Sequence, residues 1–295
     1  MRSRLALGAL GLITLLAPQC ALAQPHARAS HRAEAVAASW TPARMAAARP
    51  LDLVRDGGGR MQLRRAHPVP FTSMEVPDPT VYPNSANGRL FGHLKGLGDY
   101  ACSATVLDTP NGKVILTAGH CVLEPRLGRF ASDIVFVPAY TDATAPYGIW
   151  SWQSAATTRE WAYKGNTNYD FATVKLRELN ATPIETVVGG RQMQTNIVRN
   201  QSYAAFGYPV NLGGGERQWS CFSGYAGKDP HPFRDGKAPS AIGCDMTAGA
   251  SGGGWVNAAA RLVSVTSFGY QAQPNVVFGP YLTVKARKLV TRQGG

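Results

Sequence analysis

Short β-prone runs separated by turn residues dominate the sequence from about Tyr82 onward, and this pattern constrains the fold most strongly. No helical periodicity lies between the runs, so we expect an all-β sandwich or barrel. A short C-terminal helix is expected over residues 280–293. The expected strands are GRLFGHL (88–94), ACSATVLD (101–108), KVILTA (113–118), DIVFVPAY (133–140), YDFATVKL (169–176), SYAAFGYP (202–209), GGWVN (253–257), RLVSVTSF (261–268) and NVVFGPYL (275–282).

The N-terminal part of the chain differs from the rest. Arg2 and Arg4 precede the apolar run LALGALGLITLLA, and the small residues ALA follow, which is typical of a secretory signal peptide over residues 1–23. The run is too short for an uncleaved membrane anchor. Residues 24–80 are rich in Ala, Arg, His and Pro, and predict a pro-segment or a flexible tail. We therefore expect one folded domain over residues 81–295, secreted outside the cell or into the periplasm.

Four cysteines remain once the predicted signal peptide, which contains Cys20, is set aside. An even number of cysteines in an exported protein indicates two disulfides. Four cysteines allow three pairings, and folding a hairpin at the turn TPNG favours the pairs Cys102–Cys121 and Cys221–Cys244. Zinc is the alternative, but the paired CxxC or HxxxH spacing typical of metal sites is missing. We therefore expect no metal.

The formal net charge is +12, from 30 basic and 18 acidic residues. The basic residues are scattered and form no stripe interleaved with aromatic residues, which disfavours a role in binding nucleic acid. No stretch after residue 23 is long and apolar enough to span a bilayer, so we expect no stable membrane association.

The stretch CDMTAGASGGGW (244–255) surrounds Ser251 with alanine and glycine. Glycine is unfavourable inside helices and strands, so such a run marks backbone that lies very close to another group. A serine hydroxyl becomes a nucleophile when an adjacent base takes its proton and a carboxylate orients that base. His120, at the end of the KVILTA strand, is the candidate base, and the Cys102–Cys121 disulfide would fix its position.

The candidate acid is Asp170. Alternation in YDFATVKL places Asp170 on the same face as Ala172 and Val174, and an inward carboxylate needs a partner such as His120 because burying a charge alone is costly. Asp133 in SDIVFVP is the nearest rival, but both faces of its strand are apolar and leave its direction undecided.

The order of these residues along the chain separates three kinds of hydrolase. GASGG satisfies the GxSxG pattern of esterases and lipases, but their order is Ser, acid, His, and no histidine follows Ser251. A subtilisin-like order would need an acid before TAGHC, and no good candidate lies there. The order His120, Asp170, Ser251 fits the double-barrel proteases.

TAGHC (117–121), YDFATVKL (169–176) and GASGG (249–253) resemble the three signature blocks of chymotrypsin-like, or trypsin-like, serine endopeptidases. The segments CSATV and CDMTAGASGG are similar to those of secreted microbial members, including glutamyl-endopeptidase-like ones. The resemblance runs from about Tyr82 to the C-terminal helix. It implies two packed antiparallel six-stranded β-barrels, polypeptide substrates, no cofactor and a monomer.

The resemblance also implies a division of roles. His120 and Asp170 would come from the first barrel, and Ser251 from the second. His120 would take the proton of Ser251 and deliver it to the leaving amine, while Asp170 would hold the imidazole tautomer. The backbone N–H groups of Gly249 and Ser251 would form the oxyanion hole for the charge that develops on the carbonyl oxygen, and a side chain at 249 would obstruct that turn.

Two segments bear on substrate preference. Asp245 lies six residues before Ser251, where trypsin-like members keep the acid of the primary specificity pocket, which implies cleavage after Arg or Lys. A structural role for Asp245 in the adjacent disulfide loop is the alternative. TSFGY (266–270) resembles the strand along which substrate pairs in antiparallel direction, with substrate-binding positions at Thr266, Ser267 and Gly269. Glutamyl-specific relatives place a histidine near Thr266, so a preference for Glu is disfavoured.

Ala250 departs from the pattern of the animal digestive enzymes, which carry an aspartate there that pairs with the new N-terminus after activation. If a zymogen exists, inhibition is therefore expected from residues 24–80 covering the cleft.

Two other functions compete with a secreted endopeptidase. One is a catalytically silent protease-fold binding protein, which the intact His120, Asp170 and Ser251 disfavour. The other is a basic exported binding module that uses residues 24–80 for its contacts.

Overall fold

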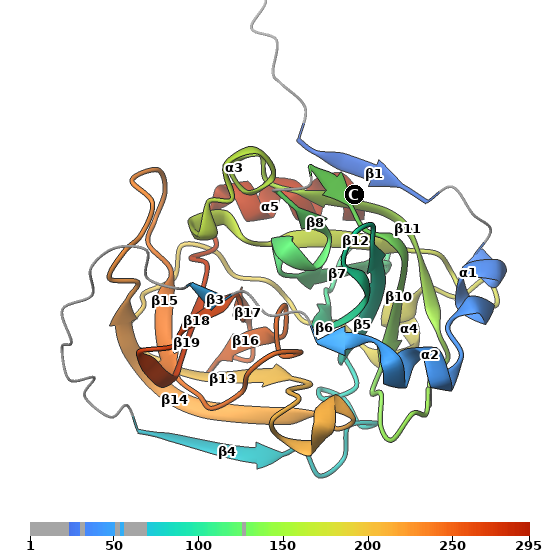
Figure 1. Cartoon of the computed structure of the whole chain (residues 1–295), viewed down its shortest axis with the longest axis horizontal. Coiled ribbons are helices and arrows are strands. Elements are labelled where there is room, and N and C mark those ends of the chain that lie inside the picture. Colours follow the sequence, from blue (N-terminus) through green and yellow to red (C-terminus); the bar gives the residue numbers. More distant parts are fainter. Residues whose placement is uncertain (1–23, 30–32, 51–53, 56–69, 126–127) are drawn as a thin grey trace, which may run out of the picture.

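Two mainly antiparallel β-sheets form most of the structure. The computed structural model describes residues 24–29, 33–50, 54–55, 70–125 and 128–295. The expected signal peptide, residues 1–23, lies outside the described residues. Figure 1 shows the green strands of the first sheet beside the orange and red strands of the second. In the part of the chain that the structure describes, no helix has the length and apolarity required to cross a membrane.

The first sheet contains a closed six-stranded barrel. Its strands pair in the ring β5–β6–β7–β12–β11–β10, and β10 pairs back to β5. Large apolar side chains such as Leu90, Phe136 and Trp150 are at most 1% exposed and fill its interior. The strands are β5 (Asn87–Leu94), β6 (Gly98–Val106), β7 (Val114–Thr117), β10 (Ser132–Pro138), β11 (Trp150–Thr157) and β12 (Ala172–Leu176). The connections contain the short elements η1 (Gly119–Cys121), β8 (Leu123–Glu124), β9 (Arg129–Phe130), α3 (Arg159–Lys164), η2 (Thr167–Tyr169) and α4 (Ile184–Val188).

The second sheet is an open half-barrel. The order β17–β16–β13–β14–β15–β19–β18 surrounds a core that includes Ile242, Trp255 and Val263. The elements are β13 (Ser202–Gly207), η3 (Gly213–Gly215), β14 (Trp219–Lys228), β15 (Ser240–Gly243), β16 (Gly254–Asn257), β17 (Leu262–Val265), β18 (Phe268–Tyr270) and β19 (Gln273–Gly279). The final helix α5 (Val284–Gly294) packs Ala286 and Leu289 against β7 and β12 of the first barrel. The all-β fold with a C-terminal helix is thus confirmed, with the second barrel left open.

Parts of residues 24–80 pack on both sheets. Strand β1 (His26–Arg28) pairs with β11, and the helices α1 (Ala33–Ser39) and α2 (Pro42–Ala47) follow it. The short strands β2 (Arg49–Pro50) and β3 (Val54–Arg55) pair with β6 and β18. Strand β4 (Phe71–Glu75) pairs with β14, so the second sheet already begins before residue 81.

The sequence pattern did not indicate β11 or β14. Strand β11, WSWQSAAT, is rich in serine and alanine and has one β-branched residue, Thr157. Strand β14, WSCFSGYAGK, contains two glycines and no β-branched residue, so both lack the run of β-branched residues typical of strands. Both are held by partners on two sides, which shows that tertiary pairing outweighs their weak local preference.

Candidate active site

His120 lies in η1, directly after β7, and its side chain is 3% exposed. Its backbone N–H donates to Asp170 Oδ1 at 2.8 Å, and its Nδ1 lies 2.8 Å from Asp170 Oδ2. Trp161 packs edge-on against the imidazole, with ring centroids 6.2 Å apart. A Cβ at Gly119 would lie 2.8 Å from both Asp170 Oδ1 and Trp161, so only glycine leaves space for this contact.

Asp170 is completely buried and accepts three hydrogen bonds. The third comes from the hydroxyl of Ser267, at 2.5 Å. Asp170 ends η2 with φ −75° and ψ 68°, and β12 begins only at Ala172, so the strand is shorter than expected. A carboxylate ion can only accept, so Nδ1 of His120 carries the hydrogen and Nε2 is left as the basic nitrogen.

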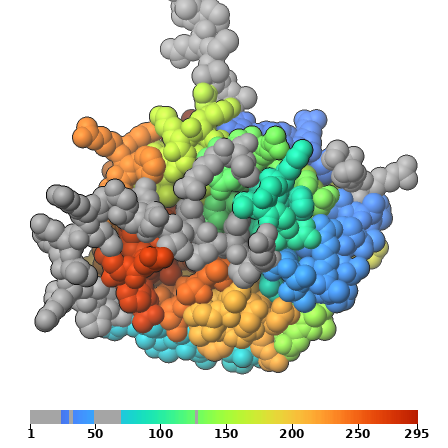
Figure 2. Space-filling view, in the orientation of Figure 1, coloured from blue at the N-terminus to red at the C-terminus, as the bar shows by residue number. Residues whose placement is uncertain are grey.

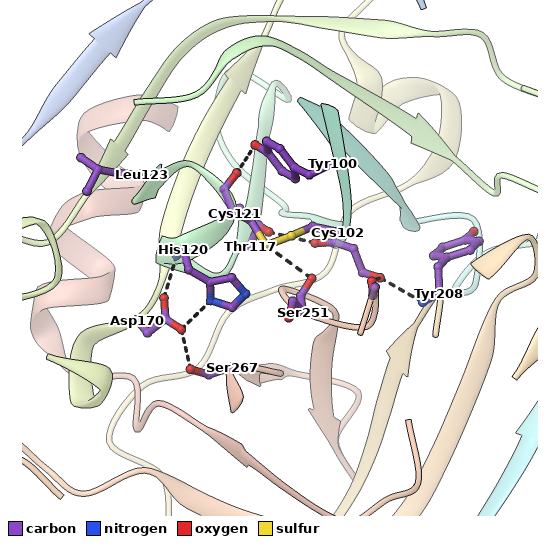
Figure 3. The surroundings of a disulfide bond; sticks show 12 residues. Tyr100, Cys102, Thr117, His120, Cys121, Leu123, Asp170, Tyr208, Ser251 and Ser267 are labelled. Atoms are coloured by element: carbon purple, nitrogen blue, oxygen red, sulfur yellow. Dashed lines mark hydrogen bonds and ion pairs between the residues drawn. A yellow bond between two sulfur atoms is a disulfide. The ribbon is translucent and has the colours of Figure 1, made fainter. Parts of the chain in front are cut away.

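Ser251 lies on the turn between β15 and β16 and is 2% exposed. Figure 3 shows the His120 imidazole between the Asp170 carboxylate and Ser251. The three candidate residues, which are far apart in the sequence, therefore converge at the junction of the two sheets. The rival acid Asp133 lies elsewhere, at the start of β10, with φ +53°.

Ser103, which the sequence patterns did not single out, connects the two sheets at this turn. Its backbone N–H donates to Ser251 O at 2.7 Å, and its hydroxyl donates to Gly249 O at 2.8 Å. The same hydroxyl accepts the N–H of Tyr208 at 2.9 Å. The only signal for this role in the sequence was its position next to Cys102.

The turn also presents two backbone donors. Within the described residues, the N–H groups of Gly249 and Ser251 donate no hydrogen bond, whereas that of Ala250 donates to Thr247 O at 3.1 Å. Val210 N–H donates to Ala248 O at 2.9 Å and so fixes the peptide that carries the Gly249 N–H. Gly249 has φ +91°, and a Cβ there would lie 2.4 Å from Tyr208 O. A side chain is therefore excluded at 249, as expected from the sequence.

Two disulfides join Cys102 to Cys121 and Cys221 to Cys244, the pairs that hairpin folding favoured. The first links β6 to the segment that carries His120 (Figure 3). The Tyr100 hydroxyl donates to Cys121 O, and burial raises the pKa of Tyr100 so that it remains a neutral donor. Because these sulfur atoms are bonded to one another, they offer no thiolate ligands for the zinc alternative.

A cleft of about 250 Å³ opens beside Ser251. The sequence-predicted residues Asp245, Thr266, Ser267 and Gly269 all line it. The Asp245 side chain is half-buried and forms no salt bridge among the described residues. Thr266 Oγ1 accepts a hydrogen bond from Trp255 Nε1 at 2.9 Å, which ties this wall of the cleft to the core.

Comparison with curated proteins finds partial matches. The chain is 30% identical over 114 residues to a protein named extracellular metalloprotease from Bacillus subtilis. This match covers 38% of this chain and 34% of that protein. It is 32% identical over 113 residues to glutamyl endopeptidase from Bacillus licheniformis, covering 36% and 33%. The matches thus span about a third of each curated relative.

A solved structure gives a fuller match. The protease Anisep from Arthrobacter nicotinovorans is 32% identical, with a TM-score of 0.68, and the match covers 76% of this chain and 99% of that one. Residues 102–265, which contain His120, Asp170 and Ser251, match the trypsin-like peptidase domain. The chain therefore belongs to the trypsin-like peptidase domain family.

Proposed function

We propose that the protein is a secreted serine endopeptidase that cleaves polypeptides through an acyl-enzyme on Ser251. The observation that carries this proposal is the buried Asp170 carboxylate, which holds His120 by its backbone N–H and by its imidazole Nδ1, each at 2.8 Å. The imidazole lies between this carboxylate and Ser251, so Nε2 acts as the base (Figure 3). Nε2 takes the hydroxyl proton as Ser251 Oγ attacks the peptide carbonyl carbon, and then gives that proton to the leaving amine. Water repeats the cycle and releases the acid.

The charge on the attacked carbonyl oxygen is stabilised by the N–H groups of Gly249 and Ser251. Both are available within the described structure, and the neighbouring peptides are already held by Val210 and Ser103. Preorganised donors need no rearrangement when the charge develops, and each is worth roughly 3–4 kcal/mol of transition-state stabilisation.

Labelling of Ser251 tests the reaction class. A fluorophosphonate probe should label the processed protein, and Ser251→Ala should abolish labelling because the nucleophile is gone. Ser264→Ala is the matched control, since Ser264 is also a buried serine, 4% exposed, in β17 of the same sheet. Folded, processed protein that takes up no label would instead support the catalytically silent binding protein or the basic binding module.

The cleft favours substrates with Arg or Lys before the cleaved bond. Asp245 lies in the wall of the cleft without an ion-pair partner in the described residues, so a cationic side chain would satisfy it. A glutamate would meet the same negative charge at close range. Glutamate preference is the second candidate, because one curated relative is a glutamyl endopeptidase.

Replacing Asp245 should therefore alter substrate preference. We expect Asp245→Asn to lower kcat/KM for Arg peptides at least about thirtyfold, because truncating one partner of a buried charge pair costs roughly 2–5 kcal/mol. Cleavage after neutral residues should change little. Asp142→Asn is the control, since Asp142 is an exposed partner of Arg217. A peptide library would contradict the assignment if wild type preferred Glu or if Asp245→Asn kept its preference for Arg.

The cellular setting is part of the proposal. The two disulfides favour an oxidising compartment outside the cytosol, and one curated relative is named as extracellular. We assign residues 1–23 to a signal peptide, 24–80 to a pro-segment or tail and 81–295 to a monomeric peptidase domain, with β4 remaining as an added strand on the second sheet of that domain. The Anisep match spans 99% of that protein and 76% of this chain, so about a quarter of this chain has no counterpart there.

A further inference from the structure

The N-terminal segment is anchored on the outside of the first barrel. Trp40, which follows α1, is 1% exposed and packs against Phe91, with ring centroids 5.4 Å apart and the rings tilted by 40°. Its Nε1–H donates to Asp133 O at 2.7 Å. Val36 and Met45 are buried in the same cluster. Figure 2 shows the blue N-terminal part of the chain on the surface beside the green part of the first barrel, so α1 and α2 cover this side of the barrel.

An ion pair strengthens this anchor. The Arg44 guanidinium donates to both carboxylate oxygens of Asp99, at 2.8 and 3.1 Å, and lies 3.9 Å from the centre of the Trp40 ring. His93 Nδ1 lies 2.7 Å from the same carboxylate. The hydrogen bond from Arg44 is the main cause that lowers the pKa of Asp99, which favours its ionised form. Arg44 thus connects the helix, the aromatic anchor and the barrel.

Beyond α2 the chain reaches both sides of the active centre. Arg49 and Pro50 of β2 pair with Tyr100 and Ala101, the residues just before Cys102 of the His120 disulfide. Val54 and Arg55 of β3 pair with Gly269 and Tyr270, just after Ser267, and Figure 1 shows β3 beside β18. Both pairings are parallel. Among the described strands, β3 covers the outer edge of β18, which would otherwise accept an extended peptide.

We propose that this N-terminal segment is a built-in inhibitor that occupies the substrate cleft in the chain direction opposite to that of a substrate. The inference rests on the proposed function, in which substrate pairs in antiparallel direction with β18. Since β3 is parallel to β18, its direction is reversed relative to substrate. A parallel strand meets the N–H and C=O groups of β18 at a different spacing from an antiparallel substrate. In the reversed direction, the nitrogen side of each peptide bond also lies where the carbonyl side of a substrate bond would have to lie for attack by Ser251. Strand β3 therefore takes up the substrate-pairing edge of β18 in a direction that does not present a peptide bond correctly to Ser251.

Weakening the anchor should expose the active serine. In the whole chain, with its N-terminal segment shown intact by mass spectrometry, we expect Arg44→Ala to speed fluorophosphonate labelling of Ser251 about three- to thirtyfold. This range corresponds to the loss of one surface ion pair and one cation–π contact. Arg217→Ala is the matched control, because Arg217 also binds two carboxylates, Glu75 and Asp142, but contacts none of the described residues before β4. Its labelling rate should stay unchanged.

Trp40→Ala provides a second and larger test. It removes the buried anchor, so labelling should rise at least about a hundredfold. Equal labelling rates for wild type, Arg44→Ala and Trp40→Ala would contradict the proposal that the segment is an inhibitor. If the enzyme cuts its own chain between residues 49 and 55 within the hours in which it turns over a reference peptide, the proposal that the segment lies in the reversed direction is wrong. Proteolysis within residues 56–69 would free the peptidase from the segment. If the freed protein takes up no label, the proposed function is wrong, whatever the role of the segment.

Discussion

Asp170→Asn should lower kcat about ten-thousandfold at neutral pH while the protein stays folded. Asp170 Oδ1 accepts the backbone N–H of His120, so the amide oxygen of an asparagine would take that place. Its NH₂ group would then face Nδ1 of His120 and donate to it. The imidazole would have to carry its hydrogen on Nε2, and it could no longer accept the proton of Ser251. The Ser267 hydroxyl can rotate to accept from the new amide, so the pocket keeps its hydrogen bonds.

Asp133→Asn separates this effect from the mere loss of a carboxylate. Asp133 was the rival acid, and asparagine tolerates its φ of +53°. Its contact with Trp40 is made by the backbone carbonyl, which the substitution leaves in place. We expect kcat of the processed enzyme within about twofold of wild type, since among the described residues the half-buried Asp133 side chain bonds only to the exposed Ser132 and substitutions at such positions have small effects. Comparable losses in Asp133→Asn and Asp170→Asn, measured on one peptide ester, would refute the role of Asp170.

The convergence of His120, Asp170 and Ser251 could be predicted because each lies in a short block with its own chemical requirement. The order of the blocks then excluded two other hydrolase arrangements. Likewise, the turn TPNG brings Cys102 to Cys121 by local geometry, and the structure has that disulfide. These predictions depend either on residues that lie close together in the sequence or on residue types, such as histidine and cysteine, that serve few functions in proteins.

Contacts made by common residues could not be predicted. Ser103 binds the Ser251 turn across 146 residues of sequence, through one hydroxyl and one N–H, and only its position next to Cys102 distinguishes it from other serines. The composition of residues 24–80 suggested a segment outside the core fold, but Trp40 becomes buried because the first barrel offers it an aromatic partner and a carbonyl. Such pairings depend on the whole surface of the barrel.

Gly253→Ala should be the most damaging of the small substitutions near Ser251. A Cβ at Gly253 would lie 1.8 Å from Phe206 O and 3.0 Å from Ala250 O, and both are backbone atoms. No rotamer change can relieve such contacts, so either β13 or the serine turn has to move. Overpacking costs typically 1–3 kcal/mol and occasionally more. We expect a loss of at least about 3 kcal/mol of unfolding free energy, which lowers Tm by roughly 6–12 °C.

The same movement should also lower the catalytic rate. Gly253 N–H donates to Ala250 O at 2.9 Å, and Gly253 O accepts from Thr266 N–H at 2.8 Å, so a displaced Gly253 shifts the Ser251 turn. A misplacement of about 1 Å can cost about a hundredfold in rate, and we expect kcat to fall by that order. Gly224→Ala is the control, because Gly224 is exposed in β14 and a Cβ there meets nothing within 4 Å. It should keep kcat and melt at the same or a slightly higher Tm, since alanine only reduces the freedom of the unfolded chain. If Gly253→Ala melted within about 2 °C of wild type at full kcat, close backbone contact would not be the reason for glycine beside Ser251.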